Sequence, residues 1–345
     1  MQVLVTGGAG YIGSHAVQRL LAGGHDVTVI DNLSRGNRSA IDRLAERHDP
    51  SGDRLRFVEA DVGDRPIVDA VLRDAKPDAV LHFAALAYVG ESVHQPLRYW
   101  RANTSASIEL LDACLDAGVE RFIFSSTCAS YGEPSPERIP IGEDCPQHPI
   151  NPYGRSKLAF ERALFDAGEA QKLTGKAFAC AALRYFNVAG SDRTGLIGES
   201  HDPETHLIPI LLQVALGQRE RVTVFGTDYD TPDGTCVRDY VHVEDLIDAH
   251  LAVLGKLEAG DVRTYNLGIG KGSSVREMIE ATRRVTGHAI PTEDGPRREG
   301  DPPTLFADPS KIEREIGWRA SITDLDEIIE SAWRWFREHP RGYAS

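Results

Sequence analysis

A tyrosine and a lysine four residues apart are the side chains in this sequence best suited to acid–base chemistry. Tyr153 and Lys157 lie in the segment 151–157, and Thr127 precedes Tyr153 by 26 residues. Pro152 suits the first turn of a helix, and the four-residue spacing puts Tyr153 and Lys157 on one face of that helix. A phenol with a pKa of about 10 is a poor base, but a neighbouring ammonium lowers this pKa and favours the phenolate. With Thr127 holding the same hydroxyl, the three residues predict proton removal coupled to hydride transfer.

Tyr-x-x-x-Lys alone is also common on surface helices, so its interpretation depends on the glycines near the start of the chain. Gly7, Gly10 and Gly13 stand between a strand-like run and a helix-like run. Glycines here allow a tight turn and a close approach of the backbone to a pyrophosphate, and the helix N-terminus supplies N–H groups. Asp31 follows Gly13 by 18 residues, where a carboxylate binds the ribose 2′-hydroxyl of NAD and repels the 2′-phosphate of NADP. The sequence therefore predicts NAD binding, with a merely connecting Gly-rich turn as the alternative.

Other residues at the predicted strand ends point to the same cofactor. Asp61 follows the third strand and is placed to accept a hydrogen bond from the adenine amino group. The fourth strand leads into Phe83, Ala84 and Ala85, and the small alanines leave space for a dinucleotide. Arg35 and Arg38 weaken the preference for NAD over NADP unless they are ordinary surface arginines.

The elements that must position these residues alternate between two periods in the first 130 residues. Short β-branched or aromatic runs predict buried strands, and the stretches between them repeat apolar residues at helical spacing. Strands are expected at 3–5, 26–30, 56–58, 79–83, 121–124 and 177–186, with helices that include 15–22 and 108–117. This order predicts an α/β fold, a Rossmann-type doubly wound parallel sheet with helices on both faces.

After about residue 187 the chain is richer in Gly, Pro, Asp and Thr, which predicts long loops. A short strand is expected at 222–225, with helices at 207–216, 243–257 and 275–285. We expect an NAD-binding Rossmann domain at 1–187, to which part of 236–268 returns. A smaller, discontinuous substrate-binding lobe is expected at 188–345.

Composition excludes several classes of partner. The 345 residues include 38 Lys and Arg against 52 Asp and Glu, a formal net charge of −14. Such a chain repels nucleic-acid phosphates and anionic membrane surfaces, although a few arginines in a cleft still suffice for a small anion. We therefore expect neither nucleic acid nor a membrane as a partner.

The cysteines and the first residues favour a cytoplasmic protein without a metal. Five scattered cysteines without Cys-x-x-Cys argue against a disulfide framework or a structural zinc site. Met1 runs directly into a predicted strand, with no leader and no run of about 18 apolar residues. His201 and His206 share one loop, but no third ligand is evident, so no metal is expected.

Motifs along the whole chain identify a resemblance to a known family. They are Val5–His15, Asp31–Leu33, Val89–Ser92, Tyr153–Lys157, Leu183–Asn187, Asp233–Tyr240, Tyr265–Gly268 and Arg297–Asp301. The sequence resembles the extended short-chain dehydrogenase/reductases, specifically nucleotide-sugar 4-epimerases of the UDP-glucose 4-epimerase type. The resemblance implies that Tyr153 acts as base while hydride passes from C4 of a UDP-sugar to tightly held NAD. The resemblance also implies that the 4-keto sugar then rotates about its diphosphate and takes the hydride back on its other face.

The resemblance also implies the residues that bind each ligand. Expected to contact NAD are Gly7, Gly10, Tyr11, Ile12, Gly13, Asp31, Asn32, Asp61, Val62, Phe83, Ala84, Ala85, Asn103, Tyr153, Lys157 and Tyr185. Expected to contact the UDP-sugar are Thr127, Tyr153, Asn187, Leu207, Phe225, Arg238, Arg297 and Asp301. Simpler roles compete for three of these: Asn187 as a turn cap, Arg238 paired with Asp239, and Phe225 in the core, which we favour over stacking near uracil.

Four departures from the galactose-type pattern leave the sugar open. Thr127 stands where the usual residue is serine, and Ala87 stands where many members have a lysine near the cofactor. His206 replaces an asparagine that lies at the phosphates of the sugar nucleotide, and Leu305 replaces a bulky tyrosine. Other segments resemble the UDP-arabinose (UDP-xylose) 4-epimerase branch, and Leu305 leaves room for an N-acetylated sugar. UDP-glucose is the first expectation, with UDP-arabinose/UDP-xylose or UDP-N-acetylglucosamine 4-epimerase as alternatives.

The resemblance also raises two alternative functions and an expectation about the oligomeric state. A dehydratase needs an acid and a base after Thr127, where this chain has Cys128 and Ala129. A catalytically silent NAD-sensing protein would typically have lost Tyr153 or Lys157. The family is commonly homodimeric through two helices of the large lobe, so we expect a homodimer through segments near 104–117 and 153–170.

Overall fold

The computed structural model of the protein describes residues 1–298 and 302–343. The chain forms two compact units, each assembled from three separate segments. Unit 1 contains Met1–Gly132, Gln147–Arg184 and Ala249–Tyr265, and unit 2 contains Glu133–Pro146, Tyr185–Asp248 and Asn266–Ser345.

Unit 1 is built on a seven-stranded sheet with the order β10-β6-β5-β4-β1-β2-β3. Its strands are β1 (Gln2–Thr6), β2 (Asp26–Asp31), β3 (Leu55–Glu59), β4 (Ala79–His82), β5 (Arg121–Thr127), β6 (Ala179–Tyr185) and β10 (Val262–Leu267). β1 pairs in parallel with β2 and β4, β2 with β3, and β4 with β5. The chain runs outward from β1 to β3 and then returns to β4 on the other side of β1. This reversal creates a switch point between β1 and β4, where open α/β sheets bind ligands at the carboxyl ends of their strands.

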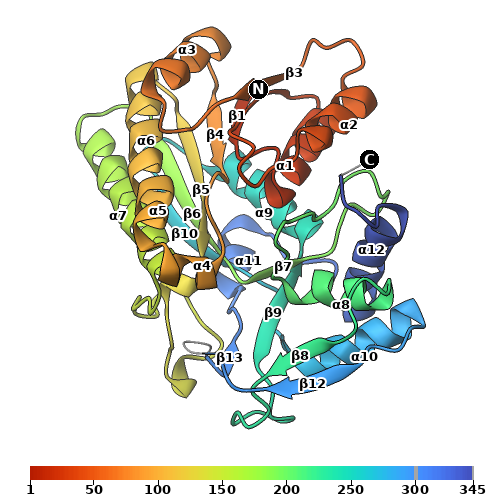
Figure 1. Cartoon of the computed structure of the whole chain (residues 1–345). Coiled ribbons are helices and arrows are strands. Elements are labelled where there is room, and N and C mark those ends of the chain that lie inside the picture. The colour runs from red at the N-terminus through yellow and green to blue at the C-terminus, as the bar shows by residue number, and fades with distance from the viewer. Residues whose placement is uncertain (299–301, 344–345) are drawn as a thin grey trace. The chain divides into compact units, whose positions relative to one another are not determined.

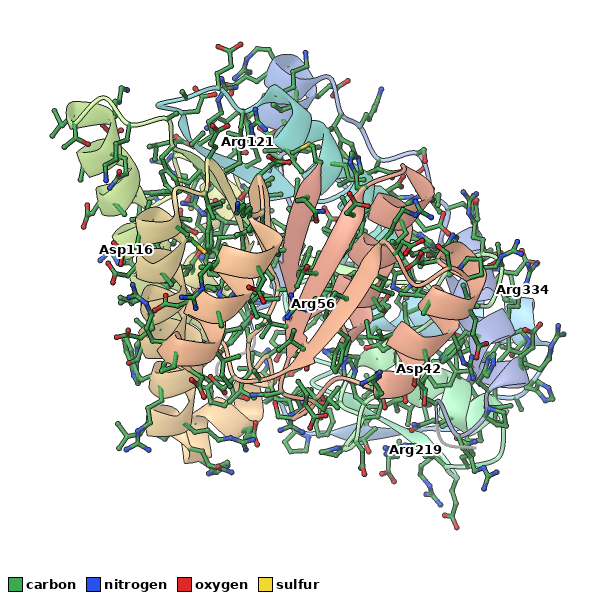
Figure 2. The ribbon with its side chains drawn as sticks, turned by 90° about the horizontal axis from the view of Figure 1, so that it is seen from above. Asp42, Arg56, Asp116, Arg121, Arg219 and Arg334 are labelled. Carbon is green, nitrogen blue, oxygen red and sulfur yellow. The ribbon has the colours of Figure 1, made fainter. Side chains whose placement is uncertain are left out.

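Helices cover both faces of this sheet, as Figures 1 and 2 show. One layer contains α3 (Arg65–Ala75), α6 (Ala106–Ala117) and α7 (Pro152–Leu173), and the other contains α1 (Tyr11–Ala22) and α2 (Arg38–His48). Asp116 and Asp42 mark these two layers in Figure 2. The predicted doubly wound fold is confirmed.

Burial explains why the strand sequences are so apolar. Every residue of β4 and β6 is buried, because helices cover both sides of these strands. The core beneath α3, α6 and α7 contains Leu4, Ile30, Val68, Val80, Leu110, Phe122, Phe124, Phe160 and Leu164. Short helical segments connect β4 to α6: α4 (Val89–His94), α5 (Pro96–Tyr99) and a π-helical turn at Trp100–Ser105.

Unit 2 packs three helices around a second apolar core. These helices are α8 (Leu207–Ala215), α10 (Val275–Thr286) and α12 (Leu325–Glu338), and Trp335 of α12 is fully buried among them. β9 (Val237–His242) pairs in parallel with β7 (Asn187–Ala189) and β13 (Thr304–Leu305), and antiparallel with β11 (Gly272–Ser274). β8 (Val222–Phe225) pairs in parallel with β12 (Thr292–Gly295), and α11 (Ser310–Ile316) precedes α12.

The helices predicted in the second half of the sequence are confirmed, with ends that agree to within two residues. They are α8, α10 and α9 (Val243–Lys256). The first part of α9 belongs to unit 2 and its second part belongs to unit 1. None of the described helices combines the length and the apolar character that crossing a membrane requires. All five cysteines are free thiols.

Candidate active site

The turn between β1 and α1 has no room for side chains at two of its glycines. Gly7 has a φ of +71°, and a Cβ there would lie 2.5 Å from the backbone N of Ala84. A Cβ on Gly13 would lie 2.1 Å from the carbonyl oxygen of Gly7. Gly10 precedes α1 without a side-chain cap, and the first turn of α1 has no acidic residue, so its N-terminus suits a phosphate. That helix begins with Tyr11, Ile12 and Gly13, three of the residues predicted to contact NAD.

Asp31 is the last residue of β2 and is only 7% exposed. Its Oδ2 accepts a hydrogen bond from the backbone N of Ala9 at 3.0 Å, and its Oδ1 accepts one from Leu33 N at 2.8 Å. Burial raises the pKa of Asp31 and these two hydrogen bonds oppose that rise. Asp31 thus ties the glycine turn to the loop after β2, and each oxygen keeps a lone pair for a ribose hydroxyl.

The two arginines beside Asp31 are matched by carboxylates of the protein itself. Arg35 donates from Nη2 to both carboxylate oxygens of Glu91 at 3.0 Å. Arg38 donates from Nε to Asp42 at 2.9 Å. Paired charges attract a 2′-phosphate less than isolated ones, so the arginines weaken the preference for NAD less than the sequence suggests.

The ends of β3 and β4 carry the remaining residues predicted for the adenine and the dinucleotide. Asn32 donates from Nδ2 to Asp61 at 2.9 Å, which joins the ends of β2 and β3. Val62, the residue after Asp61, is buried. Phe83 follows β4 and its ring centre lies 5.1 Å from that of His250. Ala84 and Ala85 come next in the chain, and both are partly buried.

Thr127, Tyr153 and Lys157 meet where β5 ends and α7 begins. Thr127 is the last residue of β5, and the other two lie on the first two turns of α7. Asn151 begins this helix by accepting a hydrogen bond from Gly154 N at 2.8 Å. The structure therefore brings the three predicted catalytic residues together within unit 1.

Each of these three side chains has a defined contact. The Thr127 hydroxyl hydrogen-bonds with the phenol of Tyr153, and its Oγ1 accepts from the backbone N of Ala129 at 3.1 Å. Lys157 is 3% exposed, and its Nζ lies 4.4 Å from the ring centre of Phe124. The hydroxyl is thus held between the tyrosine and a backbone N–H, as orientation of a reacting group requires.

The pKa values of Tyr153 and Lys157 differ from the simple expectation that the lysine makes the phenol acidic. Burial raises the pKa of Tyr153 to about 12, and the hydrogen bond from Thr127 only partly offsets it. Burial lowers the pKa of Lys157 to about 7, and the charge of Glu161 opposes this fall. Without the cationic nicotinamide, whose charge would also favour the phenolate, Tyr153 is therefore a neutral phenol at neutral pH.

A buried ion pair behind Lys157 was missed from the sequence. Glu161 and Arg184 are joined at 2.5 Å from Nη2 to Oε1, with side chains only 1% and 4% exposed. Ser126 donates from Oγ to Glu161 at 2.5 Å, and Gln147 donates from Nε2 to its other oxygen at 3.2 Å. The signal available in the sequence was the spacing, because Glu161 follows Lys157 by four residues on the same helix.

Asn103 is a positioning residue in this structure. Its Nδ2 donates to the carbonyl of Leu86 at 2.9 Å and to Ser156 Oγ at 3.2 Å, and its Oδ1 accepts from Leu86 N at 2.8 Å. Ser156 Oγ in turn donates to the carbonyl of Tyr153 at 2.8 Å. Both amide hydrogens of Asn103 are thus used to fix the chain after β4 against α7.

The residues predicted for the UDP-sugar lie in unit 2, apart from Thr127 and Tyr153. Arg238 lies on β9 and is paired in register with Leu305 of β13. Asp239, the alternative partner of Arg238, is fully buried and accepts from the backbone N–H groups of Ile269, Gly270 and Ala307 at 2.8–3.2 Å. Burial raises the pKa of Asp239 to about 6 despite these bonds.

Two of the arginines near β8 and β12 stack on aromatic rings. Arg297 lies 4.3 Å above the ring centre of Tyr229 and donates from Nε to Asp228 at 2.8 Å. Arg298 lies 4.0 Å above the ring centre of Phe225. The expectation that Phe225 is simply buried in the core is wrong, since this last residue of β8 is only partly buried and Arg298 covers one face of its ring.

The other predicted contacts fall at the ends of elements. Asn187 begins β7 and is exposed, Leu207 begins α8, and Tyr185 is the buried last residue of β6. Asp301 lies outside the described residues.

Comparison with known proteins explains this arrangement. A sequence model described as the NAD dependent epimerase/dehydratase family matches residues 3–268. The chain belongs to this family. The resemblance inferred from the sequence motifs is therefore confirmed, and so is NAD as the cofactor of the family.

The chain is similar to curated members of the family over its full length. It is 47% identical to the UDP-glucose 4-epimerase of Halalkalibacterium halodurans, with 100% of this chain and 98% of that protein covered. It is 48% identical to "Probable UDP-arabinose 4-epimerase 1" of Oryza sativa subsp. japonica, with 99% and 80% covered. The crystal structure of a UDP-glucose-4-epimerase from Stenotrophomonas maltophila, with bound NAD and formylated UDP-arabinopyranose, superposes with a TM-score of 0.92. That structure is 44% identical and covers 99% of both chains.

The residues of unit 1 fit the cofactor that the family uses. Side chains are excluded at Gly7 and Gly13, so the backbone is open to a pyrophosphate at an uncapped helix N-terminus. Asp31 ends the neighbouring strand at the position of a ribose-binding carboxylate. The glycine turn, Asp31 and the Tyr153–Lys157 pair all belong to the carboxyl edge of one sheet.

Proposed function

We propose that this protein is a UDP-sugar 4-epimerase that interconverts UDP-glucose and UDP-galactose with NAD as a bound cofactor. The observation that carries the proposal is the Thr127–Tyr153–Lys157 cluster at the end of β5, in a sheet whose first turn suits a dinucleotide. The 47% identity to a UDP-glucose 4-epimerase over the whole chain supports it. NAD, when bound, supplies a hydride acceptor that takes the C4 hydrogen of the sugar and returns it.

The side chains of this protein handle the proton. Tyr153 takes the proton of the C4 hydroxyl while the C4–H bond breaks and the C4–O bond becomes a carbonyl. The same tyrosine returns the proton when the hydrogen comes back to the opposite face, so no net oxidation occurs. Thr127 orients the hydroxyl, and Lys157 in its ammonium form stabilises the phenolate. Because burial lowers the pKa of Lys157 to about 7, the pH near neutrality decides how much of this ammonium is present.

The proposed diphosphate contacts are the guanidinium groups of Arg238 and Arg297, with Asn187 on the same ligand. A guanidinium stays charged and binds two phosphate oxygens at once. Arg297 already pairs with Asp228 at 2.8 Å, so a diphosphate competes with this carboxylate for it. Leu207, Phe225 and Asp301 complete the proposed set.

UDP-arabinose and UDP-xylose form the second candidate pair, and Leu305 is the observation that favours a third candidate, an N-acetylated UDP-sugar. Leu305 is 8% exposed on β13 and sits in register with Arg238, so it borders the proposed diphosphate contact. Leucine is smaller than the tyrosine it replaces, so Leu305 does not exclude an N-acetyl group. The contacts around the sugar must then select the substituent at C5. The 48% identity to the rice protein supports the same pair.

The test is an epimerisation assay on the purified protein with no added NAD. UDP-galactose is supplied and UDP-glucose is measured by chromatography, with UDP-xylose in a parallel reaction. Conversion supports the epimerase and a retained cofactor, and the ratio of the two rates selects the sugar. Tyr153→Phe should lose turnover by about 10²-fold or more while keeping its fold and its bound dinucleotide. No conversion of any UDP-sugar by protein that carries dinucleotide would overturn the proposal.

We also propose that the protein is a homodimer through the segments near 104–117 and 153–170, in α6 and α7, together with the face formed by α4, α5 and the start of α6. Val93, Leu97, Trp100 and Ile108 on this face are 57%, 65%, 36% and 41% exposed, which is unusual for so many large apolar side chains together. A hollow of about 520 Å³ borders Trp100 and is lined on its other side by α7 residues such as Leu158. An isologous dimer would cover this face in both copies.

Light scattering tests the dimer. The measured mass of the protein in solution should be twice the mass of one chain. Leu97→Glu should lower the measured mass to that of the monomer. Leu173→Glu, at an apolar residue that is 88% exposed at the end of α7, is the matched control and should leave the mass unchanged. A monomeric mass at all concentrations would contradict the proposal.

The same proposal assigns NAD binding and UDP-sugar binding to different parts of the chain. The expected NAD domain at 1–187 carries the glycine turn, Asp31 and the Tyr153 cluster, and the expected lobe at 188–345 carries Arg238 and Arg297. Five free thiols, four of them buried, support the expected cytoplasmic location.

A further inference from the structure

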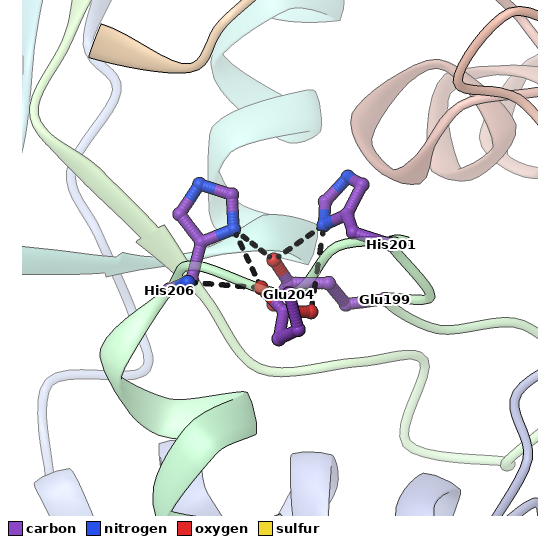
Figure 3. Close-up of side chains that lie close together, drawn as sticks. All are labelled: Glu199, His201, Glu204 and His206. Atoms are coloured by element: carbon purple, nitrogen blue, oxygen red, sulfur yellow. Dashed lines mark hydrogen bonds and ion pairs between the residues drawn. The ribbon is translucent and has the colours of Figure 1, made fainter. Parts of the chain in front are cut away.

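Two glutamates and two histidines converge in the loop that leads into α8. Glu199, His201, Glu204 and His206 each place one ligand atom within 4.8 Å of the others. Figure 3 shows both imidazole rings turned with Nδ1 toward the two carboxylates. The sequence analysis found no third ligand for the histidines, because the glutamates interleave with them as Glu-x-His-x-x-Glu-x-His.

Four distances between nitrogen and oxygen atoms of this cluster are close to the ligand–ligand distances of a tetrahedral metal site. His206 Nδ1 lies 2.8 Å from Glu199 Oε1 and 3.2 Å from Glu204 Oε1. His201 Nδ1 lies 3.2 Å from Glu199 Oε1 and 3.7 Å from Glu204 Oε2. Ligands about 2.0–2.2 Å from a tetrahedral zinc ion are about 3.3–3.6 Å apart. Small movements of these four side chains would therefore suffice to surround one ion.

The charges of the cluster balance in two ways. Glu199 and Glu204 are 7% and 3% exposed, so their two negative charges need compensation inside the protein. Two protonated histidines provide it, and so does one divalent cation with both histidines neutral. Burial alone would lower the pKa of His206, but Glu199 and Glu204 outweigh it and raise this pKa to about 10. The pKa of His201 is raised to about 9 for the same reason, because Glu199 and Glu204 outweigh the effect of burial.

We propose that Glu199, His201, Glu204 and His206 form a binding site for one divalent transition-metal ion, with Zn²⁺ as the best fit. Two imidazole nitrogens and two carboxylate oxygens match the donor preference of zinc. The side chain of His206 is 44% exposed, which gives an ion a route to buried carboxylates.

Contacts around the cluster already hold its members in place. Glu204 Oε1 accepts from the backbone N of Thr205 at 2.8 Å and from that of His206 at 2.9 Å. The carbonyl of Glu199 accepts from Trp335 Nε1 at 2.9 Å, which ties the loop to α12. Such bonds orient ligands before the ion arrives. A bound ion would fix the segment directly before Leu207, the first residue of α8.

Proton release distinguishes this site from weak surface binding. Any proton held by an imidazole nitrogen that binds the ion must leave as the ion enters, so binding should release protons. The affinity should then rise with pH, because each imidazole binds a metal ion only in its neutral form.

The experiment is a calorimetric titration of the chelator-treated, full-length protein with Zn²⁺, in buffers of different ionisation enthalpy. We expect one ion per chain, a Kd below about 10 µM at pH 8 and a release of protons on binding. Co²⁺ should give the intense visible absorption of a tetrahedral complex. His201→Gln/His206→Gln should lower the affinity by at least about 100-fold, whereas His94→Gln, at an exposed histidine of α4, should leave it unchanged.

Absence of stoichiometric uptake by the unaltered protein would overturn the proposal and leave the cluster as two ion pairs. Equal uptake by the double histidine variant would overturn it as well. The spectrum and the proton release are read on the unaltered protein, so they remain informative if a variant fails to fold. All readouts are independent of epimerase activity, so this proposal and the proposed function fail separately.

Discussion

The guanidinium of Arg184 holds the carboxylate of Glu161 inside unit 1, with Nη2 2.5 Å from Oε1 and Nε 3.2 Å from both oxygens. Arg184 also donates from Nη1 to the hydroxyl of Tyr131 at 2.7 Å. The charge of Glu161 reaches Lys157 one helical turn away and opposes the fall in the pKa of that lysine. The carboxylate of a buried ion pair on β6 and α7 therefore favours the charged form of the proposed catalytic lysine, although burial has the larger effect.

Glu161→Gln should destabilise the protein strongly, because it leaves the charge of Arg184 buried without a carboxylate. The expected loss is about 3–5 kcal/mol in the free energy of unfolding, measured by urea denaturation. The control is Asp42→Asn, which removes the carboxylate from the pair with Arg38, where both side chains are 53% exposed. That pair should contribute less than about 0.5 kcal/mol. Similar losses in the two variants would contradict the prediction.

Lys157→Met should stabilise the protein at neutral pH while abolishing epimerisation. The folded-state pKa of Lys157 is about 7, below the ordinary value for lysine, so between these values the unfolded chain binds more protons than the folded one. This lysine therefore makes stability rise with pH above about 7, and its full unfavourable contribution is present below that pH. Replacing it with an apolar chain should add on the order of 1–4 kcal/mol at pH 7.

The measurement is the free energy of unfolding of both proteins at several pH values from 6 to 10. The gap between them should shrink as the pH rises. A variant that is less stable than the parent at pH 7 would show that Lys157 is held in its charged form by contacts stronger than burial.

Thr127→Val and Thr127→Ser separate the role of the hydroxyl from that of the side-chain volume. The valine variant loses the hydrogen bond with Tyr153 and the cap on Ala129 N. A hydrogen bond to a group that becomes charged is worth about 1.5–3 kcal/mol, so kcat should fall roughly 10–100-fold. The serine variant keeps the hydroxyl and should stay within about tenfold of the parent. Equal kcat values for the valine and serine variants would exclude Thr127 from the reaction.

Gly13→Ala should abolish the cofactor site, because its Cβ would lie 2.1 Å from the carbonyl oxygen of Gly7. The turn must move, so we expect loss of bound dinucleotide and a destabilisation of about 1–3 kcal/mol or more. Gly255→Ala, in α9, meets no atom within 4 Å and is the matched control. It should be neutral or stabilise by up to about 1 kcal/mol. Dinucleotide retained by Gly13→Ala at the level of the parent would contradict the role of this turn.

Local sequence by itself determined the elements and the catalytic spacing. Strand and helix periods depend on neighbouring residues, and so does the four-residue spacing that puts Tyr153 and Lys157 on one face of α7. The glycine turn was equally readable, since close packing and a positive φ at Gly7 restrict those positions to glycine. β10 was missed because it is an edge strand whose first three residues are only partly buried, so its apolar pattern is weak.

Only the tertiary structure decided which distant charges meet and how far burial shifts them. Arg184 reaches Glu161 across 23 residues, and Arg297 reaches Asp228 across 69, distances that no local period encodes. The raised pKa of Tyr153 and the lowered pKa of Lys157 come first from burial, which depends on elements packed from far apart in the chain. The same reason applies to the loop before α8, where a turn of the backbone brings two glutamates between two histidines that looked isolated in the sequence.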